Sequence, residues 1–428
     1  MKIRNIKQNL FAYEQIMLIA YLVKWSFFAL LVGVLSGSAS ALFLNTLQWA
    51  TNWRNMHDWI IAFLPVGGFV IGALYYYYGQ SVVKGNNQLL DEFQDPKRII
   101  PFRMAPLVFF GTIATHFFGG SAGREGTGVQ IGGAIADQLT RVFKLNIHDR
   151  RILIVCGISG GFASVFGTPL AGAIFALEVL VVGRMRYEAI VASFLTALIA
   201  NISCNWWGVD HTHYEIPFVP SLTLEFVGWS ILAGIAFGLT AMLFSKMSHQ
   251  IGKLSVLTIK YPPLRPVVGG ALLALVVYLI GTTKYIGLGV PTIVDSFSIP
   301  QPEYAFMAKL LFTTFTLGMG FKGGEVTPLF FIGATLGNTL SFIIPLPMAL
   351  LAGMGFVAVF AGAANTPIAC LVMGIELFGI ECGIYLAIAC VVAYLFSGHS
   401  GIYTSQLIGS AKYVTPKHYE GKRLGDVK

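Results

Sequence analysis

Carboxylates placed inside long apolar stretches are the residues in this sequence that most clearly indicate chemistry. Glu125 lies in the sequence GREG (residues 123–126), and Glu325 lies in GEVTP (residues 324–328). A carboxylate at membrane depth costs about 2.5–3.5 kcal/mol on insertion scales, so each such residue is a functional candidate by default. By taking up and releasing a proton, a carboxylate at this depth can act as a gate or as a proton carrier.

Glu125 stands at the predicted start of a helix that runs to about Leu139. The glycines on either side, Gly123 and Gly126, free the backbone at this point. Exposed N–H groups and the positive end of a helix dipole would attract a carboxylate or a bound anion to the same place. A side chain that competes with an anion for one site would act as a gate and a proton carrier together. The simpler alternative is a helix-capping carboxylate paired with Arg124.

Three other places offer hydrogen-bond donors for an anion. A second helix is predicted to start in residues 324–328, where Pro328 fits the first turn because its missing N–H has no helical partner there. Asn86 precedes a short apolar run, and it can offer amide N–H groups or simply cap a helix. Tyr403 carries a hydroxyl that can donate to an anion or anchor the chain at the membrane interface.

The elements that must position these residues repeat within the chain. GTPLAGAIFALE (167–178) matches NTPIACLVMGIE (365–376), and each copy ends in a glutamate ten residues after its threonine. Each of these glutamates lies well inside a helix, which favours a structural role at the helix end. Upstream, residues 123–139 and 324–340 form a second matching pair. Interrupted helices in corresponding positions of two halves indicate a transporter with its site at the repeat interface.

Composition places the chain in a membrane. Of 428 residues, 55% are apolar and 11% are charged, and the mean hydropathy is +0.71. An ordinary soluble domain has about 25% charged residues, and one core could not bury this much apolar surface, so lipid must cover part of it. The net charge of +8 gathers in short breaks and at both ends. This positive-inside pattern predicts cytoplasmic termini and argues against nucleic-acid binding.

The apolar runs predict an all-α polytopic membrane protein with many short, broken helices. Many runs are shorter than the roughly 20 residues of a full span. Several contain Gly/Pro clusters, and because non-helical backbone at this depth must be buried or line a wet cavity, the clusters predict a pathway. The expected runs are 26–50, 59–78, 104–119, 125–140, 152–183, 188–206, 223–247, 266–281, 305–320, 326–344, 348–380 and 383–397.

The domain organisation expected from these runs is one transmembrane unit. Residues 1–25 form a cytoplasmic N-terminal segment, 26–410 form the membrane domain, and 411–428 form a short cytoplasmic tail. The two repeats are expected at about 26–206 and 222–410, without soluble regulatory CBS domains. The five cysteines are scattered without metal-ligand spacing, so no metal and no cofactor are expected.

At the residues named above, the sequence resembles the CLC family of chloride channels and proton antiporters. GREGTGVQIGG (123–133) resembles the GREGP motif, and GGEVTPLFFIGA (323–334) resembles the GxFxP motif. Residues 85–87 stand where the GSGIP motif belongs, and Tyr403 matches the pore tyrosine. The resemblance covers about 26–410. It implies a CLC-type fold with inverted-topology halves, an anion path, a homodimer and a place in the inner (plasma) membrane.

Departures from the family pattern resemble the CLC-F subclade of fluoride/proton antiporters. Asn86 replaces the usual serine, Thr127 replaces the motif proline, and Val179 stands where chloride antiporters carry an inner proton glutamate. The resemblance implies gating and proton transfer by Glu125, with Glu325 as a candidate second carboxylate. The anion-binding residues that it implies are Asn86, Gly123, Arg124, Gly126, Thr127, Val326, Thr327 and Tyr403.

The function predicted from these residues is proton-coupled export of fluoride from the cytoplasm. Fluoride is small and tightly hydrated, so its site must replace water with N–H and O–H donors. Fluoride enters cells as HF and dissociates at neutral pH, so coupling to proton entry would drive its export. A chloride channel or Cl⁻/H⁺ exchanger of the same fold is the alternative. A membrane-embedded enzyme is disfavoured because no paired Asp motif, HExxH or nucleophile with a base occurs in the runs.

Overall fold

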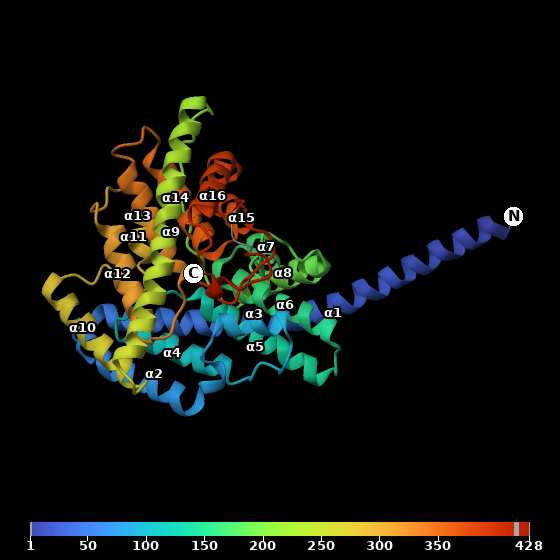
Figure 1. Cartoon of the computed structure of the whole chain (residues 1–428), viewed down its shortest axis with the longest axis horizontal. Helices are drawn as coiled ribbons and strands as arrows, with labels where there is room; N and C mark the ends of the chain where they lie inside the picture. The colour runs from blue at the N-terminus through green and yellow to red at the C-terminus, as the bar shows by residue number, and fades with distance from the viewer. Residues whose placement is uncertain (1, 415–418, 428) are drawn as a thin grey trace.

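The computed structural model describes residues 2–414 and 419–427, with side chains described from residue 14 onward. These parts of the chain are mostly helical (Figure 1). The α-helices are α1 (Lys2–Met56), α2 (Leu64–Tyr78), α3 (Asn86–Gln94), α4 (Met104–Phe117), α5 (Glu125–Val142), α6 (Ile147–Phe166), α7 (Pro169–Glu178), α8 (Ile190–Trp206), α9 (Leu224–Thr258), α10 (Leu264–Ile280), α11 (Val290–Asp295), α12 (Ala305–Gly318), α13 (Val326–Leu340), α14 (Met348–Ala364), α15 (Pro367–Phe378) and α16 (Gly383–Phe396).

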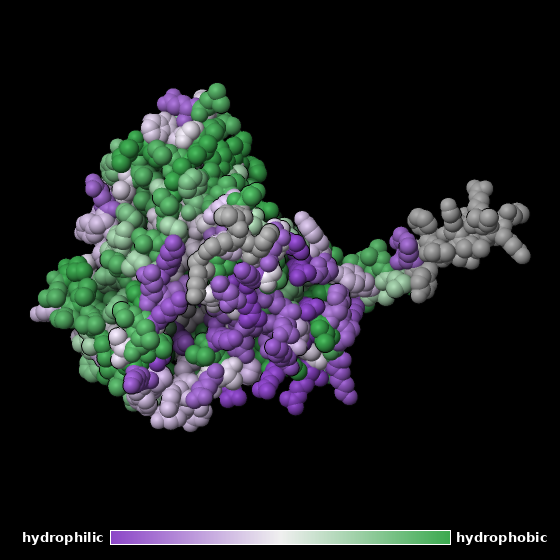
Figure 2. Space-filling model, in the orientation of Figure 1, coloured by the Kyte–Doolittle hydropathy of each residue, from purple (hydrophilic) through white to green (hydrophobic). Residues whose placement is uncertain are grey.

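The described residues are those of a multi-pass membrane protein. Four helical segments are long and apolar enough to cross a bilayer, namely Glu14–Met56, Asp58–Tyr78, Tyr187–Trp206 and Leu224–Thr258, and many others are apolar but short. Figure 2 shows apolar residues covering the faces formed by α9 and α10, while hydrophilic residues gather over α3 and α5. An apolar exterior of this kind is expected where lipid replaces water as the solvent.

Two of the long apolar runs are each broken into two helices, as the sequence predicts. Gly167 separates α6 from α7 with a φ of 76°, and Asn365 separates α14 from α15 with a φ of 59°. Both residues are in the left-handed conformation that ends helices, which glycine adopts freely and asparagine tolerates. A proline then occupies the first position of α7 and of α15, where no N–H is needed.

The glutamates at the ends of α7 and α15 cap each other's helices. Glu376 accepts the backbone N–H groups of residues 170–171 at 2.9 and 2.8 Å. Glu178 accepts those of residues 368–369 at 3.1 and 2.8 Å. Each carboxylate therefore satisfies donors that a helix start leaves without an intrahelical partner. The exchange places α7 and α15 antiparallel and gives both glutamates a structural role.

Matching glycine contacts bring the inner helices of each half together. A β-carbon on Gly132 in α5 would overlap the carbonyl oxygen of Gly157 in α6. A β-carbon on Gly333 in α13 would overlap the carbonyl oxygen of Gly355 in α14. Small residues at such crossings let helix backbones come into contact. In lipid there is little hydrophobic driving force between helices, so this close van der Waals packing holds them together. The same packing device therefore recurs in both halves.

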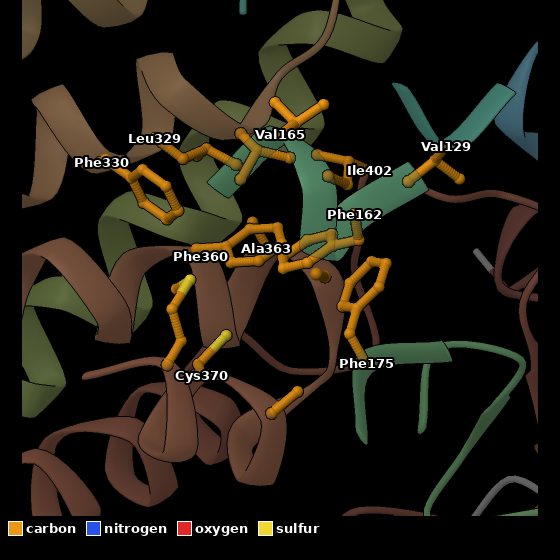
Figure 3. Close-up of a cluster of buried hydrophobic side chains, with 14 of the residues drawn as sticks. Val129, Phe162, Val165, Phe175, Leu329, Phe330, Phe360, Ala363, Cys370 and Ile402 are labelled. Atoms are coloured by element: carbon orange, nitrogen blue, oxygen red, sulfur yellow. The ribbon is translucent and has the colours of Figure 1, made fainter. Parts of the chain in front are cut away.

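The core lies where the two halves meet (Figure 3). The rings of Phe162 in α6 and Phe175 in α7 stack with centroids 4.3 Å apart, and Phe360 of α14 stacks against both of them. Beyond the helices, the strands β1 (Val181–Val182) and β2 (Leu407–Ile408) pair in parallel. This pairing holds the chain that follows α16 against the segment between α7 and α8.

The helices extend past the apolar runs at several ends. The first helix begins at Lys2 although the apolar run begins near residue 26, and α9 continues to Thr258 although its run ends near residue 247. The added part of α1 contains a further apolar stretch at residues 16–23, so the candidate membrane span begins at Glu14, whereas the added part of α9 (248–258) mixes polar and apolar residues. The short helix α11 lies outside all of the predicted runs.

Candidate functional site

The two glycine-rich breaks meet at the centre of the molecule. Gly123 and Gly324 form an antiparallel bridge in which each N–H donates to the other's carbonyl, at 2.6 and 2.8 Å. Helix α5 begins two residues after Gly123, and α13 begins two residues after Gly324. The bridge therefore sets the starts of two helices side by side, where their free N–H groups and positive dipole ends combine.

Glu125 lies between these helix starts and is 1% exposed. Its carboxylate accepts the backbone N–H of Thr327 at 3.1 Å and the N–H of Arg124 at 3.1 Å. The hydroxyl of Thr327 also donates to it. The guanidinium Nε of Arg124 lies 3.6 Å from the same carboxylate. Glu125 thus occupies donors from both halves of the chain, and a small anion would use the same donors.

Glu325 is the residue before α13 and lines a cavity of about 180 Å³ that also contains Asn86 and Tyr403. We call this the donor cavity and define it by these three residues with Lys322 and Gln130. The carboxylate of Glu325 lies close to the residue after Glu125, since its Oε2 is 3.8 Å from the position of a β-carbon at Gly126. The two candidate carboxylates are therefore neighbours in space.

Asn86 lines the donor cavity and does not occupy the cap position of α3. Gly85 holds the cap position of α3 with a φ of 55°, and Asn86 is the first helical residue. The amide Nδ2 of Asn86 lies 2.9 Å from the position of a β-carbon at Gly126, so this glycine allows the close approach. The neighbouring Asn87 accepts the N–H of Ser405 at 2.9 Å and fixes the segment next to the tyrosine.

Tyr403 is 4% exposed and lines the donor cavity. The burial places it inside the protein, which argues against an anchor at the membrane interface. Val326 is the first residue of α13 and is buried. The carbonyl of Gly126 accepts the side-chain amide of Gln130 at 3.1 Å, which joins Gln130 to the same cluster.

Thr127 is turned away from the carboxylate. Its hydroxyl shares a 2.7 Å hydrogen bond with the hydroxyl of Thr112 in α4. Both residues are buried, so this contact joins α5 to α4. The other predicted anion-binding residues lie close together in the structure. The Thr127 hydroxyl is the exception, because it bonds to Thr112 in α4.

Lys322 is a residue of the donor cavity that motif reasoning missed. Its Nζ lies 4.2 Å from the centroid of the Tyr75 ring, and its stem packs on Gly111. An ammonium over an aromatic face gains a cation–π interaction while it keeps its charge. The available signal was a lone lysine in an apolar stretch, but no motif connects that position with an anion.

Asp137 has a structural role. Arg150 pairs with it at 2.7 Å and with Glu92 at 3.1 Å, and the carboxylate of Asp137 accepts the N–H of Ile100 at 2.7 Å. A buried carboxylate is tolerated when it is paired and hydrogen-bonded in this way. The cluster joins the ends of α3, α5 and α6 and lies apart from the donor cavity.

The fold and this site define a CLC-type membrane protein with two duplicated halves. The family model for the voltage gated chloride channel matches residues 67–398. The chain therefore belongs to the voltage gated chloride channel (CLC) family.

Two relatives show where the chain stands within this family. It is 53% identical to the "Chloride/fluoride channel protein" of Pseudomonas syringae pv. tomato over 97% of this chain and 93% of that protein. It is 27% identical to the "H(+)/Cl(-) exchange transporter ClcA" of a Vibrio cholerae strain over 82% of this chain and 81% of that protein.

Solved structures resemble the fold closely. A CLC-type fluoride/proton antiporter matches with a TM-score of 0.88 at 35% identity, over 90% of this chain and 98% of that one. A slow cyanobacterial Cl⁻/H⁺ antiporter matches with a TM-score of 0.76 at 20% identity, over 90% and 96% of the two chains. The second match supports the fold alone.

Proposed function

We propose that this protein is a fluoride/proton antiporter that exports fluoride from the cytoplasm in exchange for protons, with Glu125 as the gate. The observation that carries the proposal is the position of the Glu125 carboxylate on the donors of two helix starts. A negative side chain in an anion site must leave before the anion can enter. Protonation removes its charge and so weakens its hold on those donors.

The chemistry of the site supports fluoride as the anion. Asn86, Thr327 and the helix-start N–H groups are hydrogen-bond donors, and fluoride gives up its water only for such groups. The name of the Pseudomonas relative includes fluoride, and the solved structure with a TM-score of 0.88 is a fluoride/proton antiporter. We propose transport and not catalysis, because the donor cavity offers hydrogen-bond donors and a carboxylate that suit an anion and a proton.

Chloride is the second candidate substrate, because the Pseudomonas relative's name also includes chloride and the Vibrio relative is an H⁺/Cl⁻ exchange transporter. We further propose a homodimer in the inner (plasma) membrane with both termini in the cytoplasm. The positive-inside pattern of the loops supports this orientation, and the resemblance to the family supports the dimer.

Ion efflux from vesicles tests the function directly. The purified protein is reconstituted into proteoliposomes loaded with fluoride or with chloride, and a halide electrode and a pH electrode follow the same suspension. We expect fluoride efflux with proton uptake, and much slower chloride efflux. Chloride efflux as fast as fluoride efflux would contradict fluoride selectivity, and fluoride efflux without any proton uptake would contradict antiport.

A further inference from the structure

A cavity apart from the donor cavity lies where α3 ends and α6 begins. It has a volume of about 110 Å³, and its lining residues are different from those of the donor cavity. They come from the end of α3, the first turns of α6 and the segment just before α8. We call it the arginine cavity and define it by Phe93, His148, Arg151, Arg186, Glu188 and Ala189.

Arg151 is held in place by backbone groups at the wall of the arginine cavity. Its Nε donates to the carbonyl of Phe93 at 2.9 Å, and its Nη2 donates to the carbonyl of Gln94 at 3.0 Å. These carbonyls belong to the end of α3, where they have no intrahelical partner. Among the described residues no carboxylate pairs with Arg151. Because arginine carries five N–H donors, its guanidinium is fixed and still has donors for a ligand.

Arg186 lines the same cavity from the segment before α8. Its guanidinium carbon lies 5.5 Å from the centroid of the Phe93 ring. Its Nε is buried and has no hydrogen-bond partner in the described part of the chain. Its Nη1 lies 3.7 Å from the carboxylate of Glu188, which is too long for a hydrogen bond. Buried donors normally have a partner, so Arg186 also indicates a ligand.

The start of α6 adds to the positive potential of the arginine cavity. Asn146 caps this helix by accepting the N–H of Asp149, and His148 is in the first turn. The carboxylate of Asp149 is paired with Lys24 at 2.7 Å. The positive dipole end of α6 and two arginines therefore face a single other carboxylate, that of Glu188. Planar guanidinium groups of this kind match the oxygens of a phosphate group.

The size of the cavity limits what it can hold. A single water needs about 10–15 Å³, so 110 Å³ is enough for a phosphate group. Sites that enclose a whole small molecule usually have about 300–1,000 Å³. The cavity therefore suits the phosphate end of a ligand whose remaining part lies outside it.

The surroundings of the cavity indicate that this ligand is a lipid. The exposed side chains of Tyr187 and Ile190 flank the segment that carries Arg186. The hydroxyl of Tyr21 in α1 donates to the carbonyl of Glu188 at 3.0 Å, and the same part of α1 exposes apolar side chains. Tyrosines and apolar side chains beside a basic cavity are typical of the membrane interface, where such cavities bind lipid headgroups.

We propose that the arginine cavity binds the phosphate group of an anionic phospholipid from the cytoplasmic leaflet. Arg151 and Arg186 hold the phosphate, and the acyl chains lie along α1 and the start of α8. The basic residues at 141–151 and 184–186 support a cytoplasmic position for the cavity. The proposal concerns a lipid site and does not depend on which ion the protein transports.

A lipid bound at this place would stabilise the end of α3. Gln94 at that end donates to the carbonyls of Leu180 and Ser405 at 3.3 and 2.9 Å, so it already joins α3 to two other segments. A phosphate held between Arg151 and Arg186 adds a link from α3 and α6 to the segment before α8. We therefore expect the bound lipid to raise the thermal stability of the protein.

Thermal unfolding of the purified full chain in detergent tests the proposal. The probes are dioctanoyl phosphatidylglycerol, dioctanoyl phosphatidylcholine and inorganic phosphate, each added over a range of concentrations. A ligand that binds only the folded protein raises the unfolding midpoint as its concentration rises. We expect a saturable rise with phosphatidylglycerol and a much smaller effect of the other two probes. An equal rise with inorganic phosphate or with phosphatidylcholine would overturn the assignment to an anionic lipid.

Three variants separate the cavity from the surrounding surface. Arg186→Gln removes one guanidinium, and His148→Glu places a carboxylate in the cavity. Arg184→Gln is the matched control, because Arg184 is exposed, lies two residues from Arg186 and is outside the cavity. Each variant lowers the net charge equally. An acidic residue in the first turn stabilises a helix, so His148→Glu tests the site even if Arg186→Gln folds poorly.

We expect the apparent affinity for phosphatidylglycerol to fall about tenfold or more in Arg186→Gln and in His148→Glu, because charge-assisted hydrogen bonds to the phosphate are lost or opposed. Arg184→Gln should keep the wild-type affinity. An equal fall in all three variants would mean general attraction to surface charge, and unchanged affinity in both cavity variants would remove the cavity from lipid binding. Either result contradicts the proposal. The measurement involves no ion flux, so its failure leaves the proposed transport function intact.

Discussion

In the proposed function, the single side chain of Glu125 both closes the ion path and carries a proton. Its carboxylate is buried and held by the N–H and the hydroxyl of Thr327. The capping alternative that the sequence left open is also present, because Arg124 lies 3.6 Å away. A cap and a gate are compatible here, since the group that caps two helix starts is the group that an anion must displace.

Glu125→Gln should remove proton coupling, because an amide has the shape of the carboxylate and does not titrate in this range. We expect fluoride to move down its own gradient while an imposed fluoride gradient no longer moves protons. A fluoride electrode and a pH electrode in the same vesicle suspension measure both. Proton uptake that still follows the fluoride gradient would show that another residue carries the proton.

Thr327→Val should weaken fluoride binding once the competing carboxylate is removed. In a Glu125→Ala background the valine keeps the backbone N–H and loses the hydroxyl donor. Fluoride affinity should fall about ten- to a hundredfold, because a hydrogen bond to a charged group contributes about 1.5–3 kcal/mol. Thr335→Val is the control, since that hydroxyl bonds Phe331 within α13. Equal affinities for the two variants, measured by calorimetry, would contradict a role for the Thr327 hydroxyl.

Lys322→Met should raise the cytoplasmic fluoride concentration needed for half-maximal export. The ammonium of Lys322 lines the donor cavity over Tyr75, and a cation in a narrow cleft concentrates anions about tenfold or more. Lys84→Met is the matched control, because Lys84 lines the same cavity but pairs with Asp91 at 2.8 Å. Rate against internal fluoride is measured for both, with Lys322→Arg expected to retain the wild-type value. The same half-maximal concentration in Lys322→Met and wild type would rule out this role.

Motif residues could be predicted because their neighbours lie close in sequence, and contacts between distant helices could not. The glycines around Glu125 predict the start of a helix, so the position of Glu125 follows from its neighbours in the sequence. The partner of the Thr127 hydroxyl is Thr112 on another helix, which depends on how α4 packs. Likewise, nothing near Lys322 in the sequence indicates that its ammonium reaches the donor cavity over Tyr75.

The reciprocal caps of α7 and α15 are the element-scale counterpart of the sequence repeat. The repeat was visible as two glutamates at matching positions, but their exchange of partners requires the two helices to run antiparallel. Helix breaks were predictable because Gly, Asn and Pro report backbone conformation directly. Helix length was less predictable, because charged residues such as Lys24 and Lys246 interrupt the apolar runs before α1 and α9 end.

Glu376→Ala should lower the thermal stability of the protein. It leaves the exposed N–H of Leu170 and the partly buried N–H of Ala171 without this acceptor, and a buried donor left unpaired costs about 1–3 kcal/mol. Thermal unfolding in detergent, followed by circular dichroism, should show a lower midpoint. The exposed Glu381, just beyond α15, provides the control as Glu381→Ala. Equal midpoints in the two variants would mean that water or another group satisfies the start of α7.

Charge placement over the whole molecule predicts its orientation. The basic residues of the breaks at 97–103, 141–151 and 184–186 predict that these segments face the cytoplasm. Helix α8 crosses the membrane after the last of these breaks, so the loop between α8 and α9 is expected on the outer side. His213→Cys should therefore react with a membrane-impermeant maleimide in intact cells, and Lys97→Cys only after permeabilisation. The native cysteines are buried, so their background is low. The reverse pattern of labelling would invert the assigned direction of transport.

The hydrogen-bonded pair Gly123 and Gly324 also affects how the protein interacts with the lipid bilayer. Two backbone hydrogen bonds join the halves beside Glu125, so under the proposed function we expect the path to open by side-chain movement more than by rocking of the halves. A carrier whose halves rock has to reshape its lipid boundary in every cycle. A carrier that opens by side-chain movement would keep its outline, so we expect turnover to depend little on bilayer thickness and membrane tension.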